Sequence, residues 1–202
     1  YYPNIRHERK LYKQGFKYIA GLDEAGRGSW AGPIVAAAVI LDPKIKIKGI
    51  KDSKLLRKPL REELFQRITG LAVAWSVVAI SNAKIDELGI KHTNILAMQK
   101  ALEKILPQPD YLLIDALAIE YNNVPSQPVI KGDYKITSIA AASIIAKVSR
   151  DKIMDELNEK YPQYGFNHHK GYGTAHHFHM INKHGICEIH RKSFEPIKSF
   201  LA

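Results

Sequence analysis

The chain has 202 residues, with 30 lysines and arginines against 20 aspartates and glutamates, which gives a formal net charge of +10. Hydrophobic residues make up 46% and charged residues 25% of the sequence, so a disordered chain is excluded and one globular domain with a small appendage is expected. Because Cys187 is the single cysteine, the sequence excludes a disulfide framework and favours a reducing compartment, and we expect a cytoplasmic protein.

The apolar stretches of the sequence are too short to cross a membrane. The longest uncharged runs are 28–41, 71–82 and 136–146, and all are shorter than the ~18 apolar residues that a spanning helix needs. The first residues also lack the apolar stretch of a signal peptide, so we expect no membrane partner. The excess of basic residues fits either a solvated surface or a polyanionic partner such as nucleic acid.

Apolar segments rich in β-branched residues predict strands, and apolar residues at helical spacing predict helices. In chain order, the predicted strands are residues 17–24, 33–41, 71–80, 111–115 and 128–130. The predicted helices are 59–69, which Gly70 ends, then 83–88, 93–106, 136–161 and 174–183, which ends at Gly185. Three strands followed by strands that alternate with helices predict an α/β domain with a mixed five-stranded sheet flanked by helices.

Two segments late in the chain have a distinctive composition. The predicted helix 136–161 has a face of small residues that favours close packing on a sheet, namely Ala140, Ala141, Ala142, Ser143 and Ala146. From Pro162 onward the chain holds seven of the nine histidines, and its predicted helix makes this part a helical C-terminal extension. We therefore divide the chain into an N-terminal accessory segment 1–13, a main α/β domain 14–161 and a C-terminal extension 162–202.

Four acidic residues come at or just after the ends of apolar strands. Asp23 and Glu24 end the first strand, Asp115 ends the fourth, and Asp133 follows the fifth. Ligands of α/β proteins usually bind at the edge of the sheet. Because neighbouring residues of a regular strand point to opposite faces, Asp23 and Glu24 converge only if the strand breaks there, and the glycines that follow supply a break. One such acid is typical of a solvated turn, but four together favour a site for Mg²⁺ or Mn²⁺, which prefer oxygen ligands.

Gly26, Arg27 and Gly28 form a short loop directly after the first pair of acids. A dinucleotide-binding turn would need a helix after the glycines, whereas here another predicted strand follows. We expect instead a bare backbone that can approach a sugar or a phosphate, with Arg27 as a charged arm.

Two further segments suit a nucleic-acid backbone. Residues 51–54 and 169–173 combine cations, a hydroxyl and an aromatic ring, and Tyr172 is available to stack on a sugar or base. A zinc site is disfavoured in the histidine-rich extension because no second cluster has the usual ligand spacing. We expect a basic, solvated face at its three closely spaced histidines, His176, His177 and His179.

Six ordered motifs, taken together, closely resemble the bacterial ribonuclease HII family, the type 2 ribonucleases H. They are GLDEAGRG at 21–28 with AGP at 31–33, DSK at 52–54, LID at 113–115, KGD at 131–133, AASIIAKV at 141–148 and HKGY at 169–172. The resemblance implies a ribonuclease H-like fold and an endonuclease that depends on Mn²⁺ or Mg²⁺. It also implies that residues 14–161 form the catalytic domain and that the extension 162–202 completes the substrate site. The implied reaction cuts the RNA strand of RNA–DNA hybrids and the 5′ side of single ribonucleotides in duplex DNA, leaving 3′-hydroxyl and 5′-phosphate ends.

The resemblance also implies a role for each matching residue. The metal-binding and catalytic carboxylates would be Asp23, Glu24, Asp115 and Asp133. The ribonucleotide would be recognised by Gly26, Arg27, Gly28 and Tyr172, and phosphates would be contacted by Lys54, Ser143 and Lys147. The expected partners are RNA–DNA hybrids and DNA duplexes containing ribonucleotides, bound by a monomer, with a replication-associated partner left open. The chain departs from the family pattern at Ala116, where a glycine is common.

Two alternative functions stay open at this point. A metal-dependent DNA nuclease or integrase of the same fold would use the same acids but would not distinguish ribose from deoxyribose. A non-catalytic nucleic-acid-binding protein would keep the basic surface, but acids beside that surface would weaken its affinity for a polyanion unless a metal were bound.

Overall fold

The protein is built around one five-stranded sheet, and the computed structural model describes residues 3–201. The strands are β1 (Ile19–Ala25), β2 (Ile34–Ile40), β3 (Ala74–Ile80), β4 (Tyr111–Asp115) and β5 (Ser126–Val129). They lie in the order β3-β2-β1-β4-β5. The pairs β1–β2 and β2–β3 are antiparallel, whereas β1–β4 and β4–β5 are parallel. The predicted mixed sheet is therefore confirmed.

Eight α-helices and three short 3-10 helices lie in the described part of the chain. The α-helices are α1 (Arg6–Lys13), α2 (Lys58–Leu71), α3 (Asn82–Leu88), α4 (Ile90–Lys104), α5 (Gly132–Lys135), α6 (Thr137–Lys160), α7 (Phe166–His169) and α8 (Ala175–His184). The 3-10 helices are η1 (Ser53–Leu55), η2 (Pro162–Tyr164) and η3 (Ile197–Leu201). No helix in residues 3–201 is both long enough and apolar enough to cross a membrane.

Of the two helix ends predicted at glycines, one is confirmed and one is wrong. Gly185 has a φ of 74° and follows the last residue of α8, so the predicted end there is confirmed. Gly70, in contrast, lies inside α2, and the prediction that it ends the helix is wrong. The helix continues to Leu71 and ends where Ala72 becomes extended, with its N–H bonded to the carbonyl of Ile68. Because α2 uses these residues, β3 begins only at Ala74.

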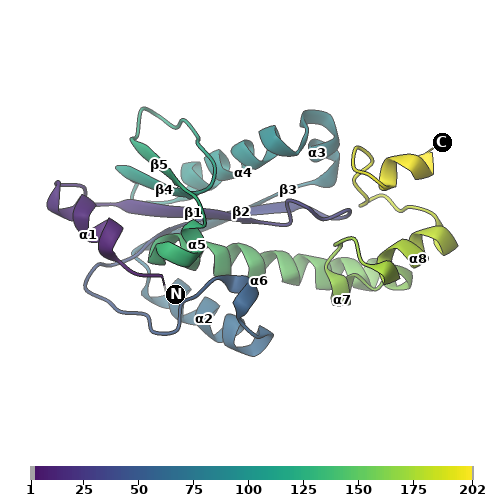
Figure 1. The fold of residues 1–202 in the computed structure, drawn as a ribbon, viewed down its shortest axis with the longest axis horizontal. Coiled ribbons are helices and arrows are strands. Elements are labelled where there is room, and N and C mark those ends of the chain that lie inside the picture. The colour runs from purple at the N-terminus through teal and green to yellow at the C-terminus, as the bar shows by residue number, and fades with distance from the viewer. Residues whose placement is uncertain (1–2, 202) are drawn as a thin grey trace.

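The sheet lies between two layers of helices (Figure 1). On one face, α3 and α4 pack over the strands, where Leu22 of β1 shares a core with Met98 and Leu102. On the other face, α6 and α2 cover the strands, where Val39 of β2 shares a core with Ile145. Because β2 is covered on both faces, all of its residues are buried.

The helix α6 approaches β1 more closely than a side chain would allow. A Cβ atom on Gly21 would lie 2.2 Å from the carbonyl carbon of Ser138 in the first turn of α6. Farther along the same helix, Ala140, Ala141 and Ala146 are fully buried in the core that faces the sheet. The predicted small-residue face therefore does pack closely on the sheet, and it fixes the depth of α6 in the molecule.

The ends of the described chain pack against this framework. Leu11 of α1 shares a small core with Ile19 and Ile136, and the buried carboxylate of Glu8 accepts a hydrogen bond from the N–H of Ser138 at 3.0 Å. At the other end, η2, α7, α8 and η3 form a helical C-terminal region around the buried rings of Tyr164 and Phe166. Tyr1 and Tyr2 of the predicted N-terminal segment lie outside the described residues.

Two glycine substitutions should have opposite effects on stability. We expect Gly21→Ala to lower the free energy of unfolding by about 1–3 kcal/mol or more, because the added methyl group meets the backbone of α6. Gly70→Ala should instead raise it by roughly 0.5–1 kcal/mol, because nothing lies within 4 Å of the new Cβ and alanine favours a helix interior. Urea unfolding of both variants measures the difference. Equal effects would contradict the close packing of α6 on β1.

Candidate active site

Three carboxylates from three different elements meet on the α6 face of the sheet. Asp23 comes from β1, Asp115 from the end of β4, and Asp133 from the first turn of α5. One oxygen atom of each lies within 4.8 Å of the others. The sheet register aligns the first two, because β1 and β4 are parallel neighbours and Leu22 is paired with Ile114.

A tight turn brings the third carboxylate to the other two. Lys131 has a φ of 56°, in the left-handed region, and this turn leads directly into α5. The N–H of Gly132 donates a hydrogen bond of 2.7 Å to Oδ1 of Asp115, which ties the start of α5 to the end of β4. Ala116, which follows Asp115, has a φ of 50°, a region that glycine adopts without strain and alanine does not. The departure from the family pattern at Ala116 therefore falls on a strained backbone position beside the cluster.

Glu24 lies outside this cluster, and the expectation that β1 breaks beside it is wrong. The strand continues through both acids, with Asp23 paired with Ala37 and Glu24 paired with Ala36. Because side chains alternate along a regular strand, Glu24 points to the α4 face, where it forms a hydrogen bond with Asn94. It still interacts electrostatically with Asp115, so it lies near the edge of the site but approaches it from the other side of the sheet.

Burial and mutual repulsion make the acids of the site difficult to ionise together. Burial, followed by the charges of Glu24 and Asp115, raises the pKa of Asp23 well above its usual value. Burial, followed by the charge of Asp115, raises the pKa of Asp133 to about 6. A bound cation would reverse these costs, and an all-oxygen donor set suits a hard divalent ion such as Mg²⁺ or Mn²⁺. In residues 3–201 this is the only group of three or more acidic, histidine or cysteine side chains close enough to share an ion.

The three residues predicted to contact phosphate lie around the cluster in different settings. Nζ of Lys54 is exposed and lies 3.8 Å from a carboxylate oxygen of Asp133. Lys147 is mostly buried, and its Nζ pairs with Asp151 at 2.7 Å. Ser143 is buried, and its hydroxyl lies 2.9 Å from that of Ser53 and also forms a hydrogen bond with Asp23. Only Lys54 among these three presents an exposed cation.

The loop after β1 is fixed at one glycine and open at the other. Gly26 has a φ of 90°, and a Cβ there would lie 2.0 Å from Nε of Arg150, so both conformation and space require glycine. Arg27 is exposed. A Cβ on Gly28, in contrast, would meet nothing within 4 Å. The internal packing of the protein therefore gives no reason for a glycine at position 28, which leaves its backbone accessible from solvent.

Tyr172 is joined to this loop through main-chain hydrogen bonds. The N–H groups of Trp30 and Ala31 both donate to the carbonyl of Gly171, at 2.8 Å and 3.3 Å. The ring of Tyr172 is partly exposed and covers the guanidinium of Arg150, whose central carbon lies 5.3 Å from the ring centre. The loop and the aromatic ring thus form one connected surface, although they are about 145 residues apart in sequence.

Two buried arginines hold this surface in place, and the sequence analysis did not identify them. Arg150 and Arg191 have no exposed area. Arg150 donates to the carbonyls of Pro33, Ala31 and Lys170, at 2.9–3.1 Å, and to the hydroxyl of Ser29 at 2.7 Å. Arg191 donates to the carbonyls of Arg27, Gly32 and Pro33 at 2.9–3.1 Å. In sequence each is an ordinary cation beside a polar segment, with no signal that it is buried.

The expectation of a solvated histidine face is wrong for one of the three histidines. His176 and His179 are exposed, but His177 is fully buried against His190, with 3.1 Å between their Nε2 atoms. Burial lowers the pKa of His177 to about 3 and that of His190 to about 4, so both rings are neutral at physiological pH. Nδ1 of His177 lies 3.0 Å from the carbonyl of Tyr172, which places the pair behind the aromatic residue.

Comparisons with known proteins agree with this geometry. The family model described as Ribonuclease HII matches residues 20–197. The ribonuclease HII of Geobacillus sp. (strain WCH70) is 49% identical over 97% of this chain and 70% of its own length. That of Caldicellulosiruptor saccharolyticus is 48% identical over 93% of this chain and 91% of its own length.

Solved structures give the same result. The crystal structure of the ribonuclease H2 from Pyrococcus horikoshii OT3 has a TM-score of 0.78 and 26% identity, covering 91% of this chain and 97% of that one. A structure of the PCNA:RNase HII complex from Archaeoglobus fulgidus has a TM-score of 0.71 and 25% identity, covering 89% and 96%. The family match runs from the start of β1 to the start of η3 and so includes the acids, the glycine loop and Tyr172. The chain therefore belongs to the ribonuclease HII family and is a ribonuclease H.

Proposed function

We propose that this ribonuclease H uses Mn²⁺ or Mg²⁺ to cut the RNA strand of RNA–DNA hybrids and the 5′ side of single ribonucleotides embedded in duplex DNA. The products are a 3′-hydroxyl and a 5′-phosphate. One observation carries the proposal. Two buried carboxylates and one half-buried carboxylate, Asp115, form a donor set that suits a divalent ion, and the open glycine backbone at Gly28 follows the strand β1 that carries Asp23.

Asp23, Asp115 and Asp133 would hold the metal ions, with Glu24 contributing from the opposite face of the sheet. When bound, the ions would polarise the scissile phosphate and lower the pKa of the attacking water. Ser143 holds the carboxylate of Asp23 in place through its hydrogen bond. Lys54 supplies an exposed positive charge for a phosphate oxygen at the rim, and Lys147 lies 5.8 Å from the ring centre of Tyr172, where it can contact the adjacent phosphate.

Selectivity for ribose requires a group that senses the 2′-hydroxyl, which is both a donor and an acceptor. The backbone of Gly26, Arg27 and Gly28 supplies donors and acceptors, and the absence of a side chain at Gly28 permits close approach. Tyr172 stacks on the neighbouring sugar, where a second 2′-hydroxyl would crowd the ring. The two elements together would recognise the junction between a ribonucleotide and the deoxyribose on its 3′ side.

The family match argues against the alternative of a DNA nuclease or integrase of the same fold. Such an enzyme would need the carboxylates but not a bare backbone at Gly28, so a duplex without ribonucleotides distinguishes the two proposals. We further propose that the chain acts as a cytoplasmic monomer and that residues 162–202 complete the substrate site, with 1–13 as an accessory segment. The Archaeoglobus fulgidus relative was solved as a complex with PCNA, and a replication-associated partner for this chain stays a prediction.

The metal site makes a prediction about activity, pH and stability together. Asp23→Asn and Asp115→Asn should abolish cleavage while the protein stays folded. Because the pKa of Asp23 is raised in the folded state, its ionisation costs stability as the pH rises through that pKa. Without metal, Asp23→Asn should therefore unfold at a higher temperature than the unsubstituted protein at pH 8, by a larger margin than at pH 4.

Added Mn²⁺ should raise the unfolding temperature of the unsubstituted protein more at pH 8 than at pH 5, because protons compete for Asp133, whose pKa is about 6. Thermal unfolding and cleavage assays measure both effects. Glu103→Gln, an exposed acid on α4, is the control and should change neither. Near-normal cleavage by either asparagine variant at saturating Mg²⁺ would show that the metal assignment is wrong.

The open position at Gly28 allows a separate test of ribose recognition. Gly28→Ala should leave the free energy of unfolding within about 0.5 kcal/mol, because the methyl group meets no protein atom. It should nevertheless reduce cleavage at a single ribonucleotide roughly tenfold or more, equivalent to about 1.4 kcal/mol in the transition state. Steady-state kinetics measure this, with Gly70→Ala as a matched glycine control. Unchanged kinetics for Gly28→Ala would remove this backbone from the recognition site.

Tyr172 should act through its ring and not through its hydroxyl. Tyr172→Phe should keep most of the activity, whereas Tyr172→Ala should lose an amount at the low end of the about 1–3 kcal/mol that aromatic stacking contributes. The assay compares duplexes that carry one ribonucleotide, four ribonucleotides and none. If the unsubstituted enzyme cuts only the four-ribonucleotide duplex, the junction proposal fails. Cutting of the all-DNA duplex would favour the alternative nuclease.

A further inference from the structure

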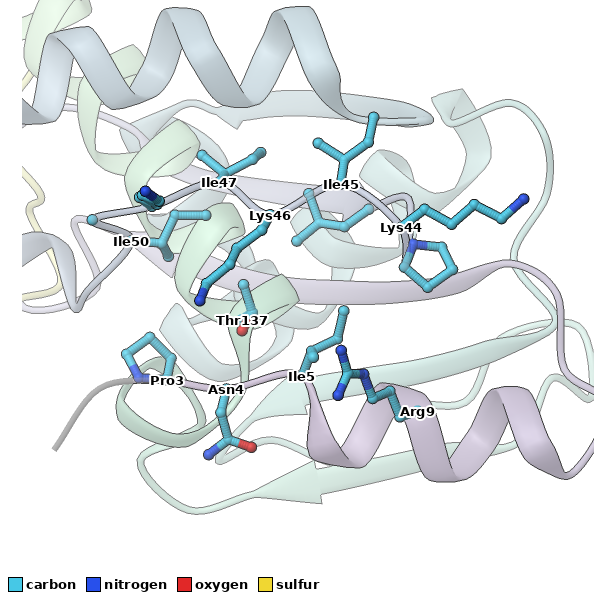
Figure 2. Close-up of a pocket in the computed structure, with 14 residues that line it drawn as sticks. Pro3, Asn4, Ile5, Arg9, Lys44, Ile45, Lys46, Ile47, Ile50 and Thr137 are labelled. Carbon is cyan, nitrogen blue, oxygen red and sulfur yellow. The ribbon is translucent and has the colours of Figure 1, made fainter.

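A hollow of about 550 Å³ lies away from the carboxylates, between the N-terminal segment and the loop that joins β2 to η1 (Figure 2). Its lining is both basic and apolar. Arg9 of α1 contributes from one wall, and Lys44, Lys46 and Lys48 of the loop contribute from the other. Figure 2 shows Lys46 extending across the hollow toward Thr137, and Arg9 rising from α1 toward the loop.

Among the described residues, these four cations have no acidic partner. All four are exposed, and within residues 3–201 none of them has a carboxylate oxygen within 4.0 Å. The acid of the same loop, Asp42, uses its carboxylate to accept the backbone N–H of Lys44 at 2.8 Å. The hollow therefore carries an uncompensated positive charge.

The loop that carries the lysines is anchored in the core. Ile47 and Ile50 are buried and share a core with Leu64 and Ile68 of α2. The carbonyl of Lys48 accepts a hydrogen bond from Arg67 at 3.2 Å. Ile47 is thus directed inward while the lysines on either side of it face solvent, so the charges are presented from a fixed segment.

Two segments of the chain connect the hollow to the candidate active site. Thr137, which lines it, begins α6 directly after α5, the helix that carries Asp133. The lysine-bearing loop continues through η1 to Lys54, whose Nζ lies 3.8 Å from Asp133. Along the longest axis of the molecule, α1 and α7, the helix that precedes Tyr172, lie on opposite sides of the centre (Figure 1).

We propose that this basic hollow binds the phosphate backbone of the duplex that flanks the cleavage site. The inference rests on the proposed function, and charge complementarity identifies the occupant, because a nucleic-acid duplex is a dense polyanion. Tyr172 is assigned to the sugar on the 3′ side of the ribonucleotide, and the hollow lies on the other side of Asp133. It therefore contacts the 5′ flank, and its exposed apolar side chain, Ile45, packs beside the sugars.

The test is the triple variant Lys44→Gln/Lys46→Gln/Lys48→Gln, assayed on duplexes with one ribonucleotide and either a long 5′ flank or a long 3′ flank. For the duplex with the long 5′ flank, we expect the KM of the triple variant to be roughly tenfold higher than that of the unsubstituted enzyme, with kcat unchanged. For the duplex with a short 5′ flank, we expect the two enzymes to have the same KM. The slope of log Kd against log salt should fall by up to about 2.7, because three phosphate contacts are lost. The rise in KM has the same cause, because the lost phosphate contacts weaken substrate binding.

The matched control is Lys91→Gln/Lys100→Gln/Lys104→Gln on α4, which removes the same charge from the opposite face of the sheet. Thermal unfolding checks that both variants are folded. We expect that they are, because the substituted lysines are exposed. Equal effects of the two triple variants, an effect confined to the 3′ flank, or an unchanged KM would each overturn the proposal.

Failure of the proposed function would give a different result. The unsubstituted enzyme would then cut no duplex that contains ribonucleotides. Fluorescence anisotropy would still measure whether the protein binds a duplex with a long 5′ flank more tightly than one with a short 5′ flank. Flank-dependent binding that the lysine substitutions remove would support the basic hollow even then, and binding that they leave intact would exclude it.

Discussion

The close approach of α6 to β1, which requires the bare Gly21, is the packing constraint on which the rest of the site depends. The N-terminal turn of α6 is fixed by Glu8, which accepts a hydrogen bond from the N–H of Ser138. One and a half turns later Ser143 meets Asp23, and farther along Arg150 reaches the loops after β1 and before Tyr172. A single helix thus sets the distance between the carboxylates and the surface that would read the sugar. A shift of α6 by the width of a methyl group would move all of these contacts together.

The buried charged groups beside α6 differ in sign between its N-terminal and C-terminal parts. Near Asp23 the buried groups are acids that repel one another, a cost that a divalent cation would offset. Near the loops the buried groups are the guanidiniums of Arg150 and Arg191, which both donate to the carbonyl of Pro33. Their other acceptors are mostly main-chain carbonyls, so no buried carboxylate is needed to satisfy them. The arginines therefore fix backbone shape without placing negative charge beside a polyanionic substrate.

The histidine pair behind Tyr172 has a proton arrangement that the hydrogen bonds determine. The backbone N–H of Cys187 can only donate, and it lies 2.9 Å from Nδ1 of His190, so that nitrogen is an acceptor. The proton of His190 is then on Nε2, which donates to Nε2 of His177. His177 must carry its proton on Nδ1, where it donates to the carbonyl of Tyr172. A chain of hydrogen bonds between neutral groups thus runs from Cys187 through the two histidines to the carbonyl of Tyr172 and supports that residue from inside the C-terminal region.

The sequence by itself predicted the five strands, although not their exact ends, because strand periodicity is a local property. It placed Asp23, Asp115 and Asp133 near the ends of strands, and the six ordered motifs identified the family and the mixed sheet. The sequence also predicted that the small-residue face of α6 packs closely on the sheet, because such packing needs only short side chains at helical spacing.

Only the tertiary structure decided the features that depend on which surface a side chain meets. It placed Glu24 on the α4 face, because β1 continues regularly where the glycines suggested a break. It buried Arg150 and Arg191, whose residue type is usually exposed, and also His177, because carbonyls and polar side chains from distant segments surround them. Within residues 3–201 it left Lys44, Lys46 and Lys48 without a carboxylate oxygen inside 4.0 Å, and burial of Ile47 turns its neighbours Lys46 and Lys48 outward. Each outcome is set by neighbours far away in the sequence, and a local pattern carries no information about them.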